Sequence, residues 1–345
     1  MVLISLHGHQ VVHIKETSSF SFFCCTSLPT NATSIMVLYL LSPITSATAP
    51  PAAGAGGDPH VIAFFGQAFT YQGICDTVLS SSPDAIGGLG FRMHARLTAA
   101  KKKKGEAGYS YISEVVVEIG IDRYEFQSEE AKLYLNSKLH PLDDDEKFTP
   151  TRFSAEPPYA LKKTVKGQRK HIVEYKFDFF NGSSVTIRSN RHFKMIFVDI
   201  VGTFDGADLH GLLGSPHKKG LFKRNGENME GKDINDYGQD WQVLVSEPKL
   251  FMDAEREPQS PSKCIVIMDT TSGIDGNDAT AQLRGRRRLL EIGDGGTAAV
   301  DTIMEIAAQN ACSHIIHSKM KEYCIDDVMA TGNLEVADEP FWEHY

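Results

Sequence analysis

Alternation of apolar and polar residues dominates the middle of the chain and predicts a succession of short β-strands. The alternating runs occupy residues 91–97, 111–120, 123–127, 131–135, 171–180, 184–189 and 193–201. Glycine, Asn-Gly or charged loops separate them, and Asn181-Gly182 between two such runs is typical of a β-hairpin. Short strands at regular intervals predict a mainly β protein, built as an antiparallel β-sandwich.

The pattern changes after Cys264, where a helical spacing of apolar residues replaces the alternation. Residues 265–297 include a stretch rich in Gly, Asp and Thr, and we expect them to form a linker. Residues 298–345 are predicted to form a small α-helical segment. Its first helix gathers three apolar residues on one face: Ile303, Ile306 and Ala307.

The first 56 residues lack periodicity, and we expect them to be poorly ordered. Residues 50–57 in particular are predicted to be a flexible lead-in. A short apolar run followed by small residues makes 36–49 similar to a secretory signal peptide, although no Lys or Arg stands between Met36 and that run.

The stretch that begins at Gly57 combines a turn with strand-forming residues. Gly57 and Asp58 are typical of a turn, and Pro59, which has no backbone N–H to donate, suits the first residue of a strand. Gly66 lies between two aromatic pairs and predicts a hairpin turn. On this interpretation Asp58 caps backbone N–H groups, and the stretch up to His60 is only the opening of a strand.

Motifs at both ends of the predicted sandwich support a more specific interpretation. They are Gly57-Asp58-Pro59-His60, Phe65-Gly66, Phe69-x-Tyr71-x-Gly73-x-Cys75, Val78-Leu79, His210 to Pro216 and Asp236 to Val243. In this order and spacing they resemble a von Willebrand factor type D domain over residues 57–264. The stretch 311–333 is similar to the small helical cysteine module that often follows such a domain. The resemblance implies a β-sandwich in an extracellular protein that assembles or adheres.

The resemblance also implies a pairing of cysteines. Cys75 and Cys264 match one bridge of the family, while Leu213 stands where another bridge has its cysteine. Cys312 and Cys324 bracket part of the helical segment and are expected to form a second bridge. Bridges of this kind belong to an oxidising compartment. The alternative is that these are free, buried cysteines of a cytosolic protein.

Many type D domains hold calcium with Asn and Asp side chains, and calcium takes six or more oxygen ligands. The matching stretch here, residues 214–219, has two lysines and no carboxylate. Only a rearranged loop could supply oxygens, from Asp205, Asp208, Asn225 and Asn228. We therefore expect no cofactor, with calcium as the alternative, and we interpret His314 and His317 as a surface pair and not as a metal site.

Composition and motifs narrow the classes of function. The net charge of −9 over 345 residues argues against nucleic acid as a partner. No apolar run approaches the roughly 18 to 20 residues that a membrane-spanning helix needs. The chain has no nucleophile elbow and no phosphate-binding glycine loop, so we expect no enzyme. The leading hypothesis is a secreted or cell-surface interaction module, with a protein or glycan partner or with self-association.

The alternative hypothesis is a protein that cleaves its own Asp58-Pro59 bond. An Asp carboxylate can attack its own carbonyl carbon to form an anhydride, and the proline nitrogen is a good leaving group because it is tertiary and readily protonated. Some gel-forming mucins and the repulsive guidance molecules resemble this stretch and cleave there. In this scheme His60 would donate a proton or orient the carbonyl.

Two further patterns concern processing. Asn181-Gly182-Ser183 is a glycosylation sequon on a predicted hairpin tip, and Asn31-Ala32-Thr33 is a second sequon. Residues 284–288, Arg-Gly-Arg-Arg-Arg, fit the pattern of secretory processing proteases; a solvated basic loop is the other interpretation.

Overall fold

The computed structural model describes residues 5–6, 10–11, 49–57, 59–101, 107–150, 157–166, 171–253, 264–267, 297–316, 318–331 and 334–338. The chain divides into two compact units, 1–48 and 49–345. In the first unit the described residues form an antiparallel pair of short strands, β1 (Ser5–Leu6) and β2 (Gln10–Val11).

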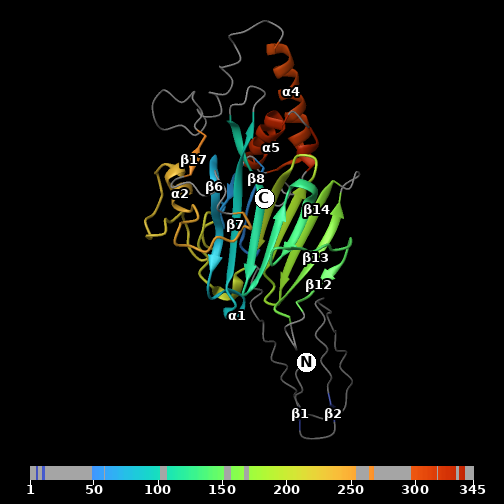
Figure 1. Ribbon diagram of the computed structural model, residues 1–345, viewed down its shortest axis with the longest axis vertical. Helices are drawn as coiled ribbons and strands as arrows, with labels where there is room; N and C mark the ends of the chain where they lie inside the picture. The colour runs from blue at the N-terminus through green and yellow to red at the C-terminus, as the bar shows by residue number, and fades with distance from the viewer. Residues whose placement is uncertain are drawn as a thin grey trace, which may run out of the picture. The chain divides into compact units, whose positions relative to one another are not determined.

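Two antiparallel sheets make up most of the second unit (Figure 1). The seven-stranded sheet has the order β11-β10-β9-β8-β7-β6-β17. Its strands are β6 (Gly73–Ser82), β7 (Phe91–Lys101), β8 (Ala107–Ile119), β9 (Asp122–Gln127), β10 (Lys132–Leu135), β11 (Lys138–Leu139) and β17 (Ile265–Val266). Consecutive strands pair as neighbours from β6 to β11, as expected for a meander with short turns.

The eight-stranded sheet has the order β12-β13-β14-β15-β16-β3-β4-β5. Its strands are β3 (Ala52–Gly56), β4 (His60–Ile62), β5 (Ala68–Thr70), β12 (Lys147–Phe148), β13 (Tyr159–Lys166), β14 (Ile172–Phe179), β15 (Ser184–Asn190) and β16 (Met195–Val201). The pairing of β16 with β3 brings the start of this unit beside a strand that ends 149 residues later, because Val201 pairs with Ala52.

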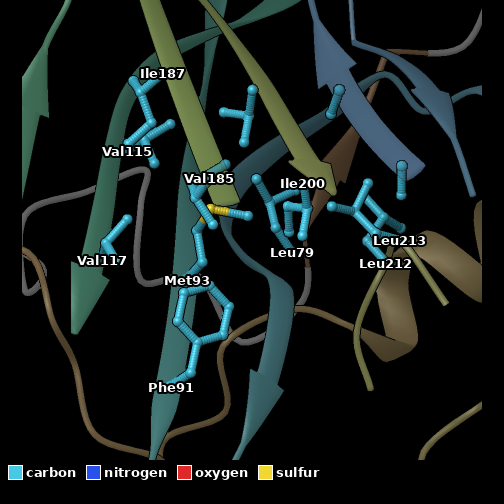
Figure 2. Close-up of a cluster of buried hydrophobic side chains, with 14 of the residues drawn as sticks. Leu79, Phe91, Met93, Val115, Val117, Val185, Ile187, Ile200, Leu212 and Leu213 are labelled. Atoms are coloured by element: carbon cyan, nitrogen blue, oxygen red, sulfur yellow. The ribbon is translucent and has the colours of Figure 1, made fainter. Parts of the chain in front are cut away.

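The main core lies between the two sheets (Figure 2). Because side chains alternate across a strand, every second residue of β7 and β8 points inward. The buried contributors include Phe91, Met93, Val115 and Val117 from one sheet and Val185, Ile187 and Ile200 from the other. Leu212, Leu213, Tyr237 and Trp241 add to the same core from the segment that follows β16. That segment contains η2 (Phe204–Gly206) and α2 (Ile234–Asp240), while α1 (Ala85–Gly88) and η1 (Glu129–Ala131) lie in turns between strands.

The structure confirms the antiparallel, mainly β fold and most of the predicted strands. The hairpins at Gly66 and Asn181-Gly182 are present, with φ of +85° at Gly66 and +81° at Gly182. The prediction of a flexible lead-in at 50–57 is wrong, because Ala52–Gly56 form β3 inside the eight-stranded sheet. β13 was not predicted either.

The C-terminal segment is helical, as predicted. It consists of α4 (Thr297–Ala311), η3 (Cys312–His314), α5 (Ser318–Thr331) and η4 (Leu334–Asp338). Its apolar residues form a second cluster with Ile62, Met195 and Phe197 of the eight-stranded sheet. On α4, Ile303 and Ile306 are exposed, while Ala308 is buried in the second cluster. Among the helices that the structure describes, none is both long and apolar enough to cross a membrane.

Candidate functional site

The Gly-Asp-Pro-His motif lies where the C-terminal helices meet the sheet. A row of cross-strand partners runs over four strands of the eight-stranded sheet: Phe197 on β16, Gly56 on β3, His60 on β4 and Thr70 on β5. Directly paired residues of a sheet share one face. The face that carries this row is covered by α5, whose Tyr323 ring stacks on the His60 ring.

His60 is the most connected residue of this contact. Its Nδ1 shares a hydrogen bond of 3.0 Å with Thr70 Oγ1, and its Nε2 lies 3.3 Å from Asp327 Oδ1. The ring centroids of His60 and Tyr323 are 4.1 Å apart, with the planes inclined by 11°. His60 is 2 % exposed and Asp327 is fully buried. The imidazole therefore connects two sheet strands to α5 through a polar contact in each direction and a stacking contact.

Glycines make room for this contact. A Cβ on Gly57 would lie 2.1 Å from Asp327 Oδ2, and the backbone there has φ of +60°, which residues with a side chain rarely adopt. A Cβ on Gly56 would lie 2.2 Å from the Phe197 ring. Glycine at position 57 is thus required twice, by backbone conformation and by the close approach of the Asp327 carboxylate.

Pro59 is buried, and its carbonyl accepts a hydrogen bond of 3.2 Å from the Tyr71 N–H. Asp58 lies outside the described residues. The structure therefore brings Gly57, Pro59 and His60 to the helical segment, but the predicted capping role of Asp58 stays a prediction. Sequence reasoning missed Asp327 and Tyr323. They follow His60 by more than 260 residues, and no local sequence pattern predicts contacts over that separation.

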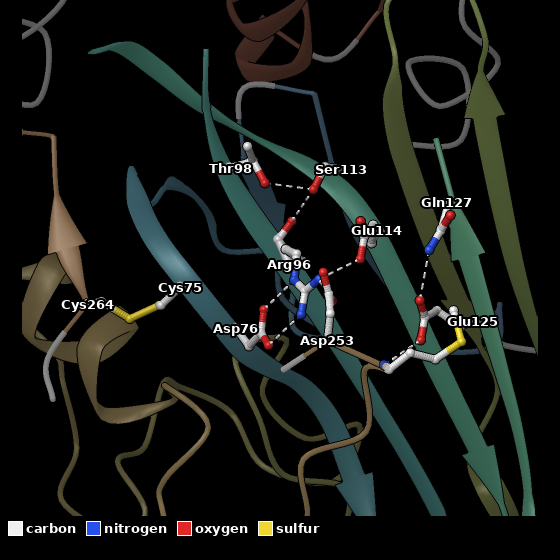
Figure 3. A network of polar contacts seen from close by, with 11 residues as sticks. Cys75, Asp76, Arg96, Thr98, Ser113, Glu114, Glu125, Gln127, Asp253 and Cys264 are labelled. Carbon is white, nitrogen blue, oxygen red and sulfur yellow. Dashed lines mark hydrogen bonds and ion pairs between the residues drawn. A yellow bond between two sulfur atoms is a disulfide. The ribbon is translucent and has the colours of Figure 1, made fainter. Parts of the chain in front are cut away.

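A polar network lies on the outer face of the other sheet (Figure 3). Arg96 on β7 is buried and donates to both carboxylate oxygens of Asp76, from Nε at 2.9 Å and from Nη2 at 3.1 Å. Its Nη1 donates to Glu114 at 2.8 Å and to Asp253. The guanidinium also stacks on Phe251, 4.3 Å from the ring centroid. One cation thus holds carboxylates from β6, β8 and the segment at 250–253.

Carboxylates outnumber cations in this network. Glu125 is buried nearby and accepts hydrogen bonds of 3.0 Å from the Met252 N–H and from Gln127. Burial raises the pKa of Glu114 to about 7, although Arg96 acts in the opposite direction. Burial likewise raises the pKa of Asp76 to about 6. Both carboxyl groups therefore bind a proton more tightly in the folded chain than in an unfolded one.

Cysteine pairs lie beside these two contacts. Cys75 and Cys264 are joined with a Cα–Cα distance of 5.3 Å and link β6 to the residue before β17 (Figure 3). Cys312 and Cys324 are joined with a Cα–Cα distance of 6.1 Å and link η3 to α5. Both distances are ordinary for disulfides. The second pair fixes α5 one residue after Tyr323, so it orients the helix that contacts His60.

The four calcium candidates are used in separate contacts. Asp205 accepts from the Gly87 N–H, and Asp208 accepts from Ser215 and Lys218. Asn225 and Asn228 each accept from a backbone N–H two residues further on. Among the residues that the structure describes, no group of three or more His, Cys, Asp or Glu side chains is arranged to hold a metal ion.

The other predicted sites differ in exposure, and some lie outside the described residues. The Asn181 amide oxygen accepts from the Ser183 N–H at 2.9 Å, and its amide nitrogen is enclosed, so a glycan there would require the side chain to turn outward. His314 is exposed, as predicted for a surface residue. Outside the described residues lie His317, Asn31, residues 284–288 and the signal-like stretch up to residue 48.

No known protein family matches this chain, and no curated protein is similar enough to be recognised as a relative. The likeness to type D domains therefore rests on the sequence motifs alone.

The contact between His60 and α5 predicts a specific loss of stability. Replacing His60 with Ala leaves the Asp327 carboxylate buried without its imidazole partner, which should lower the free energy of unfolding by about 3 kcal/mol. Urea unfolding of the whole chain measures this loss. His192→Ala is the matched control, because His192 is exposed. Equal stability of the two variants would contradict the assigned role of His60.

The Arg96 network predicts a pH dependence. Because the folded pKa of Glu114 lies above its unfolded value, this group makes the folded chain more stable as the pH falls from about 7 toward about 4. Glu114→Gln removes that contribution. The free energy of unfolding of the variant minus that of the parent should therefore increase by on the order of 2 kcal/mol when the pH is raised from 5 to 8. Urea unfolding at both pH values measures the difference; a difference that does not change with pH would refute it.

Proposed function

We propose that this chain is a secreted or cell-surface interaction module of the von Willebrand factor type D class, without enzymatic activity and without a cofactor. The observation that carries the proposal is the pair of disulfides. Cys75–Cys264 ties β6 to the residue before β17 at one edge of the seven-stranded sheet, and Cys312–Cys324 braces the helix that contacts His60. Disulfides in a globular chain favour an oxidising compartment, where they form and persist.

The position of the Gly-Asp-Pro-His motif supports a structural use of it. Gly57 and His60 are occupied with holding α5 against the sheet. In a sandwich, the loops are free to carry specificity. The partner we propose is a protein or glycan of the extracellular space, or a second copy of this chain.

Peptide mapping without reduction, on protein from the extracellular fraction of its native source, tests this proposal. The expected result is two linked peptide pairs, one joining Cys75 to Cys264 and one joining Cys312 to Cys324. The same map reports the true N-terminus, any glycan on Asn181 and any cut within 284–288. Alkylation of all four cysteines in unreduced protein, or the protein's absence from that fraction, would overturn the proposal.

One observation favours the second candidate function, self-cleavage at Asp58-Pro59. His60 directly follows Pro59, and its imidazole is paired with the Asp327 carboxylate, an arrangement suited to proton transfer. The Asp58 carboxylate would attack its own carbonyl carbon, the bond to the Pro59 nitrogen would break, and that nitrogen would take a proton. Water would then open the anhydride. The burial of Pro59 and His60 limits the access of water and makes this the lesser candidate.

If the bond is reactive, cleavage should accelerate as the pH falls from 7 toward about 5.5, because the leaving nitrogen must gain a proton. Asp58→Asn should abolish cleavage, and Asp327→Asn should slow it by weakening the His60 pair. Mass spectrometry of the folded chain at mildly acid pH follows the appearance of an N-terminal Pro59. A chain that stays intact over days leaves the motif with its structural role alone.

A further inference from the structure

A cleft of about 150 Å³ lies on the outer face of the seven-stranded sheet, between β6 and β7 on one side and the chain at 210–248 on the other. Hydrogen-bonding and basic side chains line it: Ser81, Arg92, His94, His210 and Arg224. We propose that this cleft binds an oxyanion, the carboxylate or sulfate group of an acidic sugar. The proposal concerns binding by the folded chain and does not depend on the compartment in which the protein acts.

His94 provides the first argument. It is 3 % exposed, and its Nδ1 is enclosed with no hydrogen-bond partner among the residues that the structure describes. A buried ring nitrogen without a partner is costly, and native proteins rarely keep one without a reason. In β7, Arg92 and His94 alternate with the core residues Phe91 and Met93, so both reach the outer face together. With the ring turned so that this nitrogen faces the cleft, an oxyanion there would accept a hydrogen bond from it.

The electrostatic field provides the second argument. Burial lowers the pKa of His94 to about 3, and the guanidinium groups of Arg92 and Arg224 add to that shift. The ring is therefore neutral at ordinary pH, and the two arginines beside it further lower its affinity for a proton. His94 can supply a neutral N–H donor, while the positive charge comes from the arginines.

The two arginines differ in how far their donors are occupied. Arg224 donates to the carbonyls of Asp240 and Gln242 and to both carboxylate oxygens of Glu247, and it lies over the Trp241 ring. It therefore forms a fixed wall of the cleft. Among the described residues, Arg92 forms one ion pair, from Nη2 to Glu118, and its side chain is 38 % exposed. Within that part of the chain, its remaining N–H groups are the donors available to a ligand.

The shape and remaining lining favour a sugar over a bare inorganic ion. The volume exceeds that of a single water, about 30 Å³ in the liquid, several times over, so an oxyanion leaves room for part of the ring that carries it. Ser81 and His210, which are tied together by two backbone hydrogen bonds of 2.8 and 3.0 Å, can bond sugar hydroxyl groups. The Glu247 carboxylate, which is paired with Arg224, lines the same cleft and can accept a further hydrogen bond from a sugar hydroxyl.

Isothermal titration of the full-length chain at constant ionic strength tests the proposal with three probes: sodium glucuronate, glucose 6-sulfate and uncharged glucose. Glucuronate or glucose 6-sulfate should bind saturably, and glucose should not. Binding of glucuronate alone identifies a carboxylate ligand, and binding of glucose 6-sulfate alone identifies a sulfate ligand. Arg92→Gln should weaken binding by about tenfold or more, the loss expected when a charged hydrogen-bond donor is removed.

Arg123→Gln on β9 is the matched control, since Arg123 bonds Ser137 away from the cleft, and it should bind like the parent. His94→Leu removes the imidazole donor and should also weaken binding. If that replacement impairs folding, Arg92→Gln is the decisive variant, because Arg92 is partly exposed. The proposal is overturned if neither charged sugar binds, if glucose binds equally well, or if Arg92→Gln and Arg123→Gln bind alike.

Discussion

The buried contact between His60 and Asp327 is the constraint on which the position of the helical segment against the sheet depends. The sandwich has a large core of its own between its sheets. The helical segment does not, because its buried residues share their cluster with Ile62, Met195 and Phe197 of the sheet. Short helices gain most of their stability from tertiary packing. The position of α5 therefore depends on the residues at the end of the Gly-Asp-Pro-His motif.

That dependence gives a physical reason for three residues of the Gly-Asp-Pro-His motif. Glycine at 57 is the residue that fits against the Asp327 carboxylate at a positive φ. Proline at 59 starts a strand while its carbonyl still pairs with Tyr71. Histidine at 60 has an acceptor or donor nitrogen for each neighbour, Thr70 on the sheet and Asp327 on the helix. The Cys312–Cys324 bridge then holds the helical side of the contact in shape.

Sequence reasoning captured the fold better than the contacts. Alternation predicted the long strands, and Gly66 and Asn181-Gly182 predicted hairpins, because these signals are local. β3 was missed because Ala52–Gly56 contain only Ala and Gly, which carry no alternating pattern. The spacing of apolar residues predicted a helix at α4, but a helical period does not say which side meets the sheet.

The polar contacts of Arg96 and His60 could not be predicted from the sequence for a different reason. Arg96 meets Asp76, Glu114 and Asp253 because three segments converge on one strand, and Asp327 meets His60 across the whole chain. A single sequence holds no signal for such pairings. The Cys75–Cys264 pair could be anticipated from the family resemblance, and the Cys312–Cys324 pair because these cysteines bracket part of the helical segment.

Hydrogen exchange of α5 in Gly57→Ala, compared with Gly66→Ala, tests the central claim most directly. Both glycines have positive φ, so both replacements strain the backbone, but a Cβ meets Asp327 only at position 57 and open space at position 66. The account predicts faster amide exchange across 318–331 in Gly57→Ala and protection close to that of the parent in Gly66→Ala. Equal protection of α5 in the two variants would contradict it.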